Sequence, residues 1–292
     1  MLITSHYYSR DKFGIYYKLL KINGKQDFIL NKAGLFEAAH ISMMQKIKII
    51  RHINSTFPNL YENYDIDQSK ILEEELIKLG SEKIGTYRKI LEEMRANVGT
   101  DKSFVGTITA PSEFGPVLEL GYSQMIFGSK VMPFLREMCL IYLISNFEEF
   151  LKNVLSVVFT SKPEALKSTK QISVEEVINS GTMPELLEKI IEHEVNDILD
   201  EGIDKYEKFL EDRFGVPLST DSDWTKFKEK FYRRNLLVHN NGIVNKKYIS
   251  LSKYSGSEKQ LTIDNDYLVE SLDLSLKFSK IISEFLSKKF KS

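Results

Sequence analysis

The sequence predicts a mainly α-helical protein in which a C-terminal helical bundle, residues 128–292, follows a smaller N-terminal α+β unit, residues 1–127. Apolar residues recur every three to four positions over most of the chain, which is typical of helices that bury one face. An Asn-Gly pair at residues 23–24 favours a two-residue hairpin turn. Between residues 99 and 128, five glycines and two prolines interrupt the helical pattern and indicate a domain boundary.

In the N-terminal unit, the runs Ile15–Ile22 and Lys25–Leu30 flank the Asn-Gly pair and predict a β-hairpin. Helical spacing follows over Ala33–Asn54, and Pro58 lies beyond the expected end of that helix. A second helical pattern covers Ile66–Asn97, where two glycines in the middle predict either one broken helix or two short ones.

The C-terminal part is expected to form helices separated by turn residues, with a small hairpin or extended loop before the last helix. One of these helices is predicted to start at a cap, Ser222 or Asp223, and to stop at Asn-Asn-Gly, residues 240–242, which favours the left-handed conformation. The predicted helices are Phe134–Phe159, Pro184–Leu199, Asp204–Phe214, Ser222–His239 and Asn265–Phe290, and the predicted extended pieces are Tyr248–Leu251 and Gln260–Ile263.

The composition excludes several classes of protein. Apolar residues make up 42% of the 292 positions, which is too many for a disordered chain. The formal net charge of −1 excludes a histone-like or wholly polyanionic protein. A single cysteine, Cys139, excludes an internal disulfide. The longest strongly apolar uncharged run, Met138–Phe147, is about half a bilayer span, so we expect a cytoplasmic protein without membrane contact.

Charge is unevenly distributed along the chain. Residues 171–212 carry thirteen acidic and three basic side chains, whereas residues 222–292 carry fourteen basic and eight acidic ones. Ordinary solvated helix faces explain such a pattern, and a basic region that meets phosphate groups is the functional alternative.

The most informative segment is Phe231–Gly242. On a helix with about 3.6 residues per turn, Arg234 borders one edge of an apolar stripe, and Asn235 and His239 border the other edge. The stripe is predicted to consist of Trp224, Phe227, Phe231 and Val238.

Arg234 and His239 are five positions apart, which is about 140° around a helix axis. One helix therefore does not easily aim both side chains at one phosphate. Two copies related by a twofold axis could place the arginine of each beside the histidine of the other, because such an interface is self-complementary. The spacing thus predicts a homodimer.

These residue types suit the cleavage of RNA. Attack of a ribose 2′-hydroxyl on the adjacent phosphate needs a group that moves protons near neutral pH, and a histidine, with an unperturbed pKa of about 6.5, does this. Developing negative charge on the phosphate needs a fixed cation such as a guanidinium group. The alternative is a purely structural helix end, with surface arginines and a histidine near the terminal carbonyl groups.

The sequence Arg234-Asn235-Leu236-Leu237-Val238-His239 resembles the signature of the HEPN superfamily (higher eukaryotes and prokaryotes nucleotide-binding domain). The signature is an arginine, a polar residue, a few apolar residues and a histidine near the end of a late helix, and it is found in bacterial HEPN ribonucleases of toxin and phage-defence systems. The segment Leu143–Leu151 resembles the HEPN helix that carries a Phe-Glu pair, here Phe147-Glu148. The resemblance covers residues 129–292.

The resemblance implies an endoribonuclease that needs neither metal nor cofactor and cleaves RNA at a composite site of a dimer, in toxin–antitoxin or antiviral defence. It implies that His239 transfers protons, that Arg234 binds the phosphate or stabilises the transition state, and that Asn235 is the polar partner. Glu148 is a fourth candidate for the catalytic site, and Arg233 is an alternative arginine that would bind substrate.

The resemblance also covers inactive relatives, so the alternative function is a noncatalytic binding or scaffolding protein that dimerises or binds nucleic acid. An antitoxin or another defence protein is an expected partner. In one branch of the superfamily the antitoxin modifies a tyrosine two residues after the histidine, and Asn241 occupies that position here. His193-Glu194 begins like a zinc-protease helix, but the position of the second histidine holds Asp197, so no metal site is expected.

Overall fold

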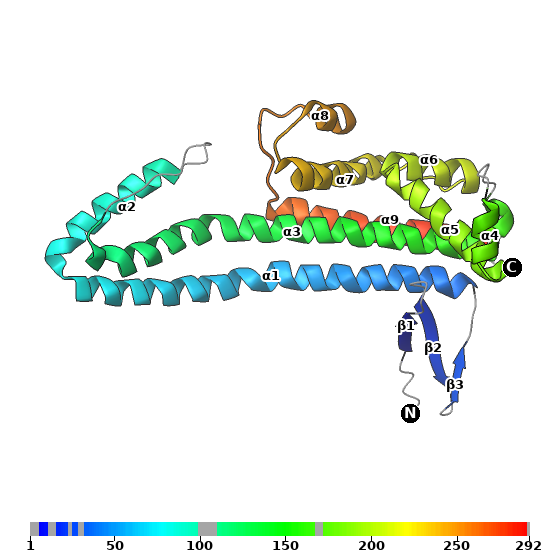
Figure 1. The fold of residues 1–292 in the computed structure, drawn as a ribbon, viewed down its shortest axis with the longest axis horizontal. Helices are drawn as coiled ribbons and strands as arrows, with labels where there is room; N and C mark the ends of the chain where they lie inside the picture. Colours follow the sequence, from blue (N-terminus) through cyan, green and yellow to red (C-terminus); the bar gives the residue numbers. More distant parts are fainter. Residues whose placement is uncertain are drawn as a thin grey trace. The chain divides into compact units, whose positions relative to one another are not determined.

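The computed structural model describes residues 6–10, 16–22, 25–28, 32–98, 110–166 and 172–290 (Figure 1). Over these residues the protein is mainly α-helical, as the sequence predicts. The short strands β1 (His6–Arg10), β2 (Tyr16–Ile22) and β3 (Lys25–Phe28) pair antiparallel in that order, with Ile22 opposite Lys25. The runs expected to form the hairpin are therefore β2 and β3, and its turn residues 23–24 lie outside the described residues.

The helices account for most of the described chain. They are α1 (Lys32–Leu79), α2 (Ile84–Val98), α3 (Gly115–Ser161), α4 (Val174–Asn179), α5 (Met183–Asp200), α6 (Ile203–Phe214), α7 (Ser222–Asn240), α8 (Lys246–Ser252) and α9 (Asn265–Lys289), with short 3₁₀ turns at Ser81–Lys83, Ser112–Phe114 and Pro163–Ala165.

The first helix does not end before Pro58, contrary to the prediction, and α1 continues to Leu79. A proline inside a helix removes one backbone hydrogen bond, but aromatic side chains on successive turns pack together around this point. The rings of Phe57 and Tyr61 are stacked with their centroids 6.4 Å apart, and Tyr61 and Tyr64 are 6.3 Å apart. The predicted break at Gly80 is confirmed, because α1 ends just before this residue, whose φ is 98°.

A domain boundary was expected within residues 99–128. From Gly115 onward this segment is helical instead, because α3 runs without a break from Gly115 to Ser161. Glycine at position 121 serves close packing instead of a turn. A Cβ atom there would lie 2.5 Å from the hydroxyl oxygen of Tyr87 on α2. Residues 99–109, in the first part of the expected boundary, lie outside the described residues.

The chain forms two compact units, residues 1–51 with 138–292 and residues 52–137. An N-terminal α+β unit of residues 1–127 is therefore not supported. The first half of α1 belongs with the C-terminal helices because it makes long-range contacts with them. Lys46 on α1 forms an ion pair with Glu149 on α3 at 2.7 Å, and His40 Nδ1 lies 3.0 Å from Ser279 Oγ on α9.

Local capping signals set most of the C-terminal helix ends. Helix α9 begins after Asp264, whose side chain accepts a hydrogen bond from the Tyr267 amide at 2.7 Å, and α6 stops at Gly215 with a φ of 69°. Helix α7 is capped by Asp221 instead of Ser222 or Asp223. The residues expected to be an extended piece, Tyr248–Leu251, lie in helix α8 instead.

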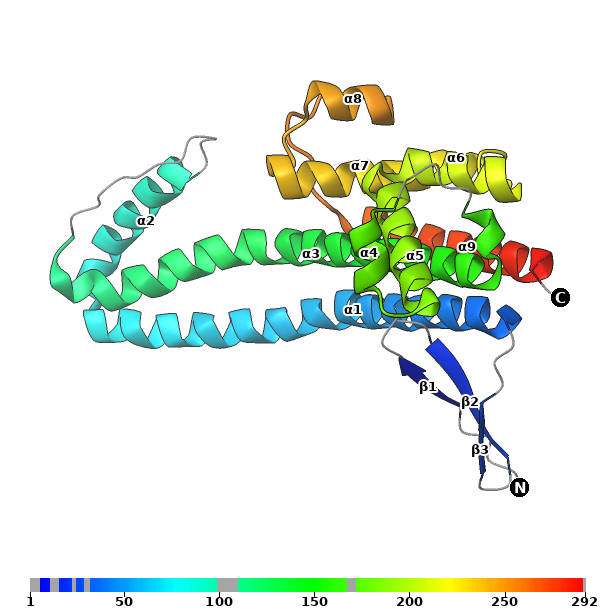
Figure 2. The same ribbon diagram turned by 45° about the vertical axis from the view of Figure 1, so that its right-hand side comes forward.

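An aromatic cluster joins α3, α7 and α9 in the larger unit, where the three helices lie alongside one another (Figures 1 and 2). Phe147 on α3 meets Phe227 on α7 edge to face at 4.7 Å, and Trp224 meets Phe278 on α9 in the same way at 4.8 Å. All four side chains are fully buried. Burial of such rings contributes more than their area alone, and it holds α7 firmly in place.

Candidate functional site

Helix α7 carries His239, Asn235 and both candidate arginines. It ends as the sequence predicts, because Asn241 and Gly242 have φ values of 49° and 74°. The amide groups of both residues donate hydrogen bonds to the carbonyl of Leu236, which closes the last turn. A Cβ atom at position 242 would lie 2.6 Å from the Leu261 carbonyl oxygen, so only glycine fits there.

The buried face of α7 differs from the predicted stripe at its C-terminal end. Trp224, Phe227 and Phe231 are buried as expected, but Val238 is 50% exposed. Leu236 is buried in its place, against Tyr248 of α8 and Leu261. The reason is that the chain returns over α7 after Gly242, which a pattern within one helix does not indicate.

The structure brings Arg234 and Glu148 together. The Nη2 group of Arg234 donates a hydrogen bond to Oε1 of Glu148 on α3, and the arginine side chain is mostly buried. Burial raises the pKa of Glu148, and the charge of Arg234 opposes that shift. The buried Nε of Arg234 has no hydrogen-bond partner among the described residues.

Arg233 is held in a separate network that joins α7, α8 and α9. Its Nε donates to Oε1 of Glu229 at 2.8 Å, and its guanidinium lies 4.4 Å from the centre of the Tyr267 ring. The hydroxyl of Tyr267 donates to Oε2 of the same carboxylate at 2.6 Å, and the hydroxyl of Tyr248 donates to Oε1. Arg233 therefore has a structural task that Arg234 does not share.

Asn235 and His239 lie one helical turn apart and are both exposed. Neither side chain forms a hydrogen bond or ion pair with any described residue. Among the residues that the structure describes, no side-chain hydrogen bond joins Asn235 or His239 to Arg234 or Glu148. The single chain thus presents two pairs, one buried and charged, the other exposed and polar.

The network around Glu229 was not predicted from the sequence. One local signal was available, because Glu229 precedes Arg233 by four residues, a spacing that favours an ion pair on a helix. The contributions of Tyr248 and Tyr267 had no local signal, since α8 and α9 bring them from later in the chain.

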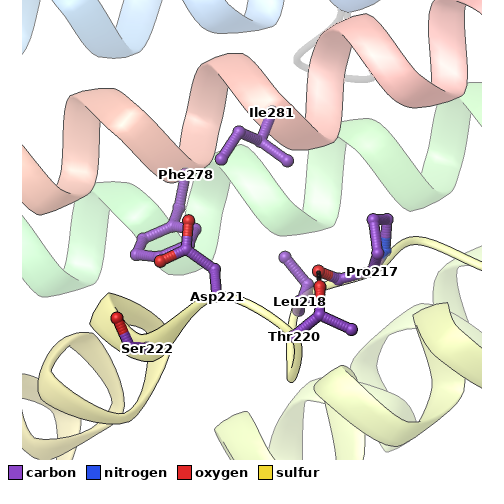
Figure 3. Close-up of a pocket in the computed structure, with 7 residues that line it drawn as sticks. All are labelled: Pro217, Leu218, Thr220, Asp221, Ser222, Phe278 and Ile281. Carbon is purple, nitrogen blue, oxygen red and sulfur yellow. Dashed lines mark hydrogen bonds between the residues drawn. The ribbon is translucent and has the colours of Figure 1, made fainter.

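A pocket of about 450 Å³ lies at the other end of α7 (Figure 3). Asp221 and Ser222 line it at the helix start, and Phe278 lines it from α9. Lys277 donates to the Asp221 carboxylate at 2.9 Å and so neutralises its charge. His239 is seventeen residues from Ser222, or about 26 Å along the axis, so this pocket is separate from the candidate site.

No set of three or more histidine, cysteine, aspartate or glutamate side chains in the described ranges is arranged to hold a metal ion. Among the same residues, no helix combines the length and apolar character needed to cross a bilayer. No family model matches the chain, and neither the curated proteins nor the solved structures yield a match.

Replacing Arg233 with alanine is expected to lower the free energy of unfolding by about 3 to 5 kcal/mol, because it leaves the Glu229 carboxylate without its main counter-charge. Both side chains are mostly buried, at 14% and 18% exposure. Urea unfolding followed by the fluorescence of Trp224, the only tryptophan, measures the change. Arg51→Ala is the matched control, because the exposed Arg51–Asp273 pair is expected to contribute at most about 1 kcal/mol.

The same network predicts how this difference depends on pH. Burial opposes ionisation of Glu229, but Arg233 and the two tyrosine hydroxyls outweigh burial, so its pKa lies below the ordinary value. The stabilisation is then complete above the unfolded pKa of about 4.3 and is lost as the pH falls through the folded pKa. The two proteins should therefore converge in stability in acid, and a difference that stays constant would contradict this role of Glu229.

Proposed function

We propose that this protein is a HEPN-type endoribonuclease that cleaves RNA without a metal ion, at a composite site of a homodimer. The observation that carries the proposal is the arrangement on α7. Arg234 is held by Glu148 of α3, and His239 and Asn235 are exposed one turn apart at the end of α7. These are the groups that phosphodiester cleavage requires, a positioned cation and an accessible imidazole.

The proposed reaction is an internal transfer of the phosphodiester bond. His239 accepts the proton of the ribose 2′-hydroxyl, and the 2′-oxygen forms a bond to the neighbouring phosphorus. The bond from phosphorus to the 5′-oxygen breaks, and that oxygen receives a proton from an imidazolium group. The products are a 2′,3′-cyclic phosphate and a 5′-hydroxyl. Arg234 stabilises the negative charge that develops on the phosphate oxygens.

Two copies of α7 complete the site. Arg234 and His239 are separated by about 140° around the helix, so a twofold axis beside α7 would pair the arginine of one copy with the histidine of the other. The half-exposed Val238, which lies next to His239, supplies an apolar surface for that contact. Glu148 acts as a positioning residue that fixes the guanidinium of Arg234, and Asn235 orients the imidazole or binds a phosphate oxygen.

The test is incubation of the purified full-length protein with a labelled RNA oligonucleotide in EDTA. We expect fragments that end in a 2′,3′-cyclic phosphate and a 5′-hydroxyl, and no cleavage of the same oligonucleotide with 2′-deoxyribose at the cleaved position. Light scattering coupled to gel filtration should give a dimer mass. If diverse RNAs all remain intact, the nuclease proposal fails and a noncatalytic HEPN-fold binding or scaffolding protein is the better description.

A role in toxin–antitoxin or antiphage defence, in the cytoplasm, belongs to the same proposal. An uncontrolled ribonuclease would damage the cell that makes it, so such a protein needs a partner or a trigger. Asn241 lacks the hydroxyl that would be needed for the modification of a tyrosine at this position. Control by an antitoxin or defence partner that binds the protein without that modification is therefore expected.

A further inference from the structure

The segment Ile243–Gln260, which contains α8, is a closed excursion of the chain attached directly to the end of α7 (Figures 1 and 2). The Val244 amide donates to the Lys259 carbonyl at 2.8 Å, and the Leu261 amide donates to the Gly242 carbonyl at 2.9 Å. Both ends of the excursion are thus tied to each other within a few residues of His239.

The inner side of this excursion is anchored. Tyr248 is buried with Leu236 and Leu261, and its hydroxyl donates to Glu229 on α7. The backbone of Gly242 also packs so closely against the Leu261 carbonyl that a side chain would not fit between them. Several independent contacts thus hold the excursion against the end of α7.

The exposed part of the excursion is basic. Its lysines are Lys246, Lys247, Lys253 and Lys259, and all of them are exposed. Within the part of the chain that the structure describes, none of these lysines forms an ion pair or a side-chain hydrogen bond. Glu258 is the only acidic residue of the segment, so its net charge is +3.

Several other lysines of the C-terminal region are paired with acidic neighbours. Lys228 binds Asp204 at 2.9 Å and Glu207 at 2.8 Å. Lys277 similarly binds two carboxylates at the start of α7. Part of the positive charge of residues 222–290 is therefore neutralised by neighbouring carboxylates, whereas the four lysines of the excursion have no such partner among the described residues.

Two of the lysines lie at a helix position where a positive charge is unfavourable. Lys246 and Lys247 occupy the first turn of α8, at the positive end of the helix dipole, where acidic residues are favoured. Their charges thus oppose the local electrostatics of the helix.

We propose that this excursion, residues 243–260, binds the sugar–phosphate backbone of the RNA substrate and guides it to His239. This inference rests on the proposed function for the identity of the ligand. Single-stranded RNA fits the surface because it offers regularly spaced phosphate groups to unpaired cations. A membrane surface fits less well, since α8 has only seven residues and two exposed large apolar side chains, Ile249 and Leu251.

The test measures RNA binding apart from cleavage. Fluorescence anisotropy with a labelled single-stranded RNA is recorded for the full chain carrying His239→Ala, at several salt concentrations. In this background, Lys246, Lys247, Lys253 and Lys259 are all replaced by glutamine. We expect binding about a hundredfold weaker at low salt, and a plot of log affinity against log salt that is shallower by about 2 to 3, or about 0.7 for each lost phosphate contact.

The matched control replaces four exposed lysines that lie elsewhere and form no ion pair with a described residue. These are Lys48, Lys89, Lys208 and Lys288. The change in net charge is the same, so a general electrostatic effect would weaken both variants equally. We expect the control to bind within about threefold of the parent. Trp224 fluorescence and circular dichroism confirm that both variants are folded.

The outcomes separate this inference from the nuclease proposal. Equal RNA binding by the two lysine variants would overturn the inference while leaving His239-dependent cleavage by the wild type untouched. Lysine-dependent binding without any cleavage would support the binding surface and remove the nuclease. Lysine-dependent binding to vesicles containing phosphatidylserine, with no affinity for RNA, would overturn the assignment of RNA as the ligand.

Discussion

Replacing His239 with alanine is expected to lower the turnover rate of RNA cleavage by about two to four orders of magnitude, because the group that moves protons to and from the ribose and the leaving oxygen is lost. His239 is exposed and makes no side-chain hydrogen bond with a described residue. The free energy of unfolding should therefore change by no more than about 0.5 kcal/mol. Initial rates with a labelled oligonucleotide, together with urea unfolding, measure the two quantities on the same preparations.

His193→Ala is the matched control for this experiment, since His193 is also an exposed histidine on a helix, α5, but has no place in the proposed site. Its turnover should equal that of the wild type. Mixing His239→Ala with an inactive Arg234→Ala protein gives a further test of the composite site. A heterodimer would contain one intact pair, so partial recovery of activity is expected. Full activity of His239→Ala alone would contradict the assignment of this residue.

Replacing Arg234 with alanine is expected to lower turnover by about a hundred- to a thousandfold, corresponding to about 2.7 to 4 kcal/mol of lost transition-state stabilisation. The physical reason is the loss of a cation that is held in place before the reaction. The effect should fall on kcat more than on KM, because the charge that Arg234 stabilises develops in the transition state. Arg234→Lys keeps the charge but loses the forked donor geometry, and an intermediate rate is expected.

Glu148→Gln tests how the guanidinium is positioned. This variant keeps the size of the side chain but removes the charge that holds Arg234, so we expect a smaller loss of turnover than in Arg234→Ala. Added guanidinium ion should partly restore Arg234→Ala and have no effect on Glu148→Gln. An Arg234→Ala protein with unchanged turnover would assign the catalytic role to Arg233 or to no arginine at all.

Arg233 and Arg234 illustrate why the sequence left their roles open. The two residues are adjacent and similar in chemistry, and their separations from His239, six and five positions, are both compatible with the HEPN signature that the sequence resembles. Their environments differ because Glu148, 86 residues earlier in the chain, reaches Arg234, whereas Arg233 meets Glu229 and the rings brought by α8 and α9. Long-range packing assigned each guanidinium to its partner.

The sequence by itself determined the helical character of the protein, the approximate span of α7, and its end at Asn241 and Gly242. These features depend on hydrogen bonds, capping and backbone conformation among residues within about four positions of each other. They can therefore be predicted from the sequence. Only the tertiary structure decided the continuity of α3, the partners of the two arginines and the return of the chain over Leu236. Each of these depends on which distant surfaces pack together, and apolar spacing within one helix does not encode the identity of its neighbour.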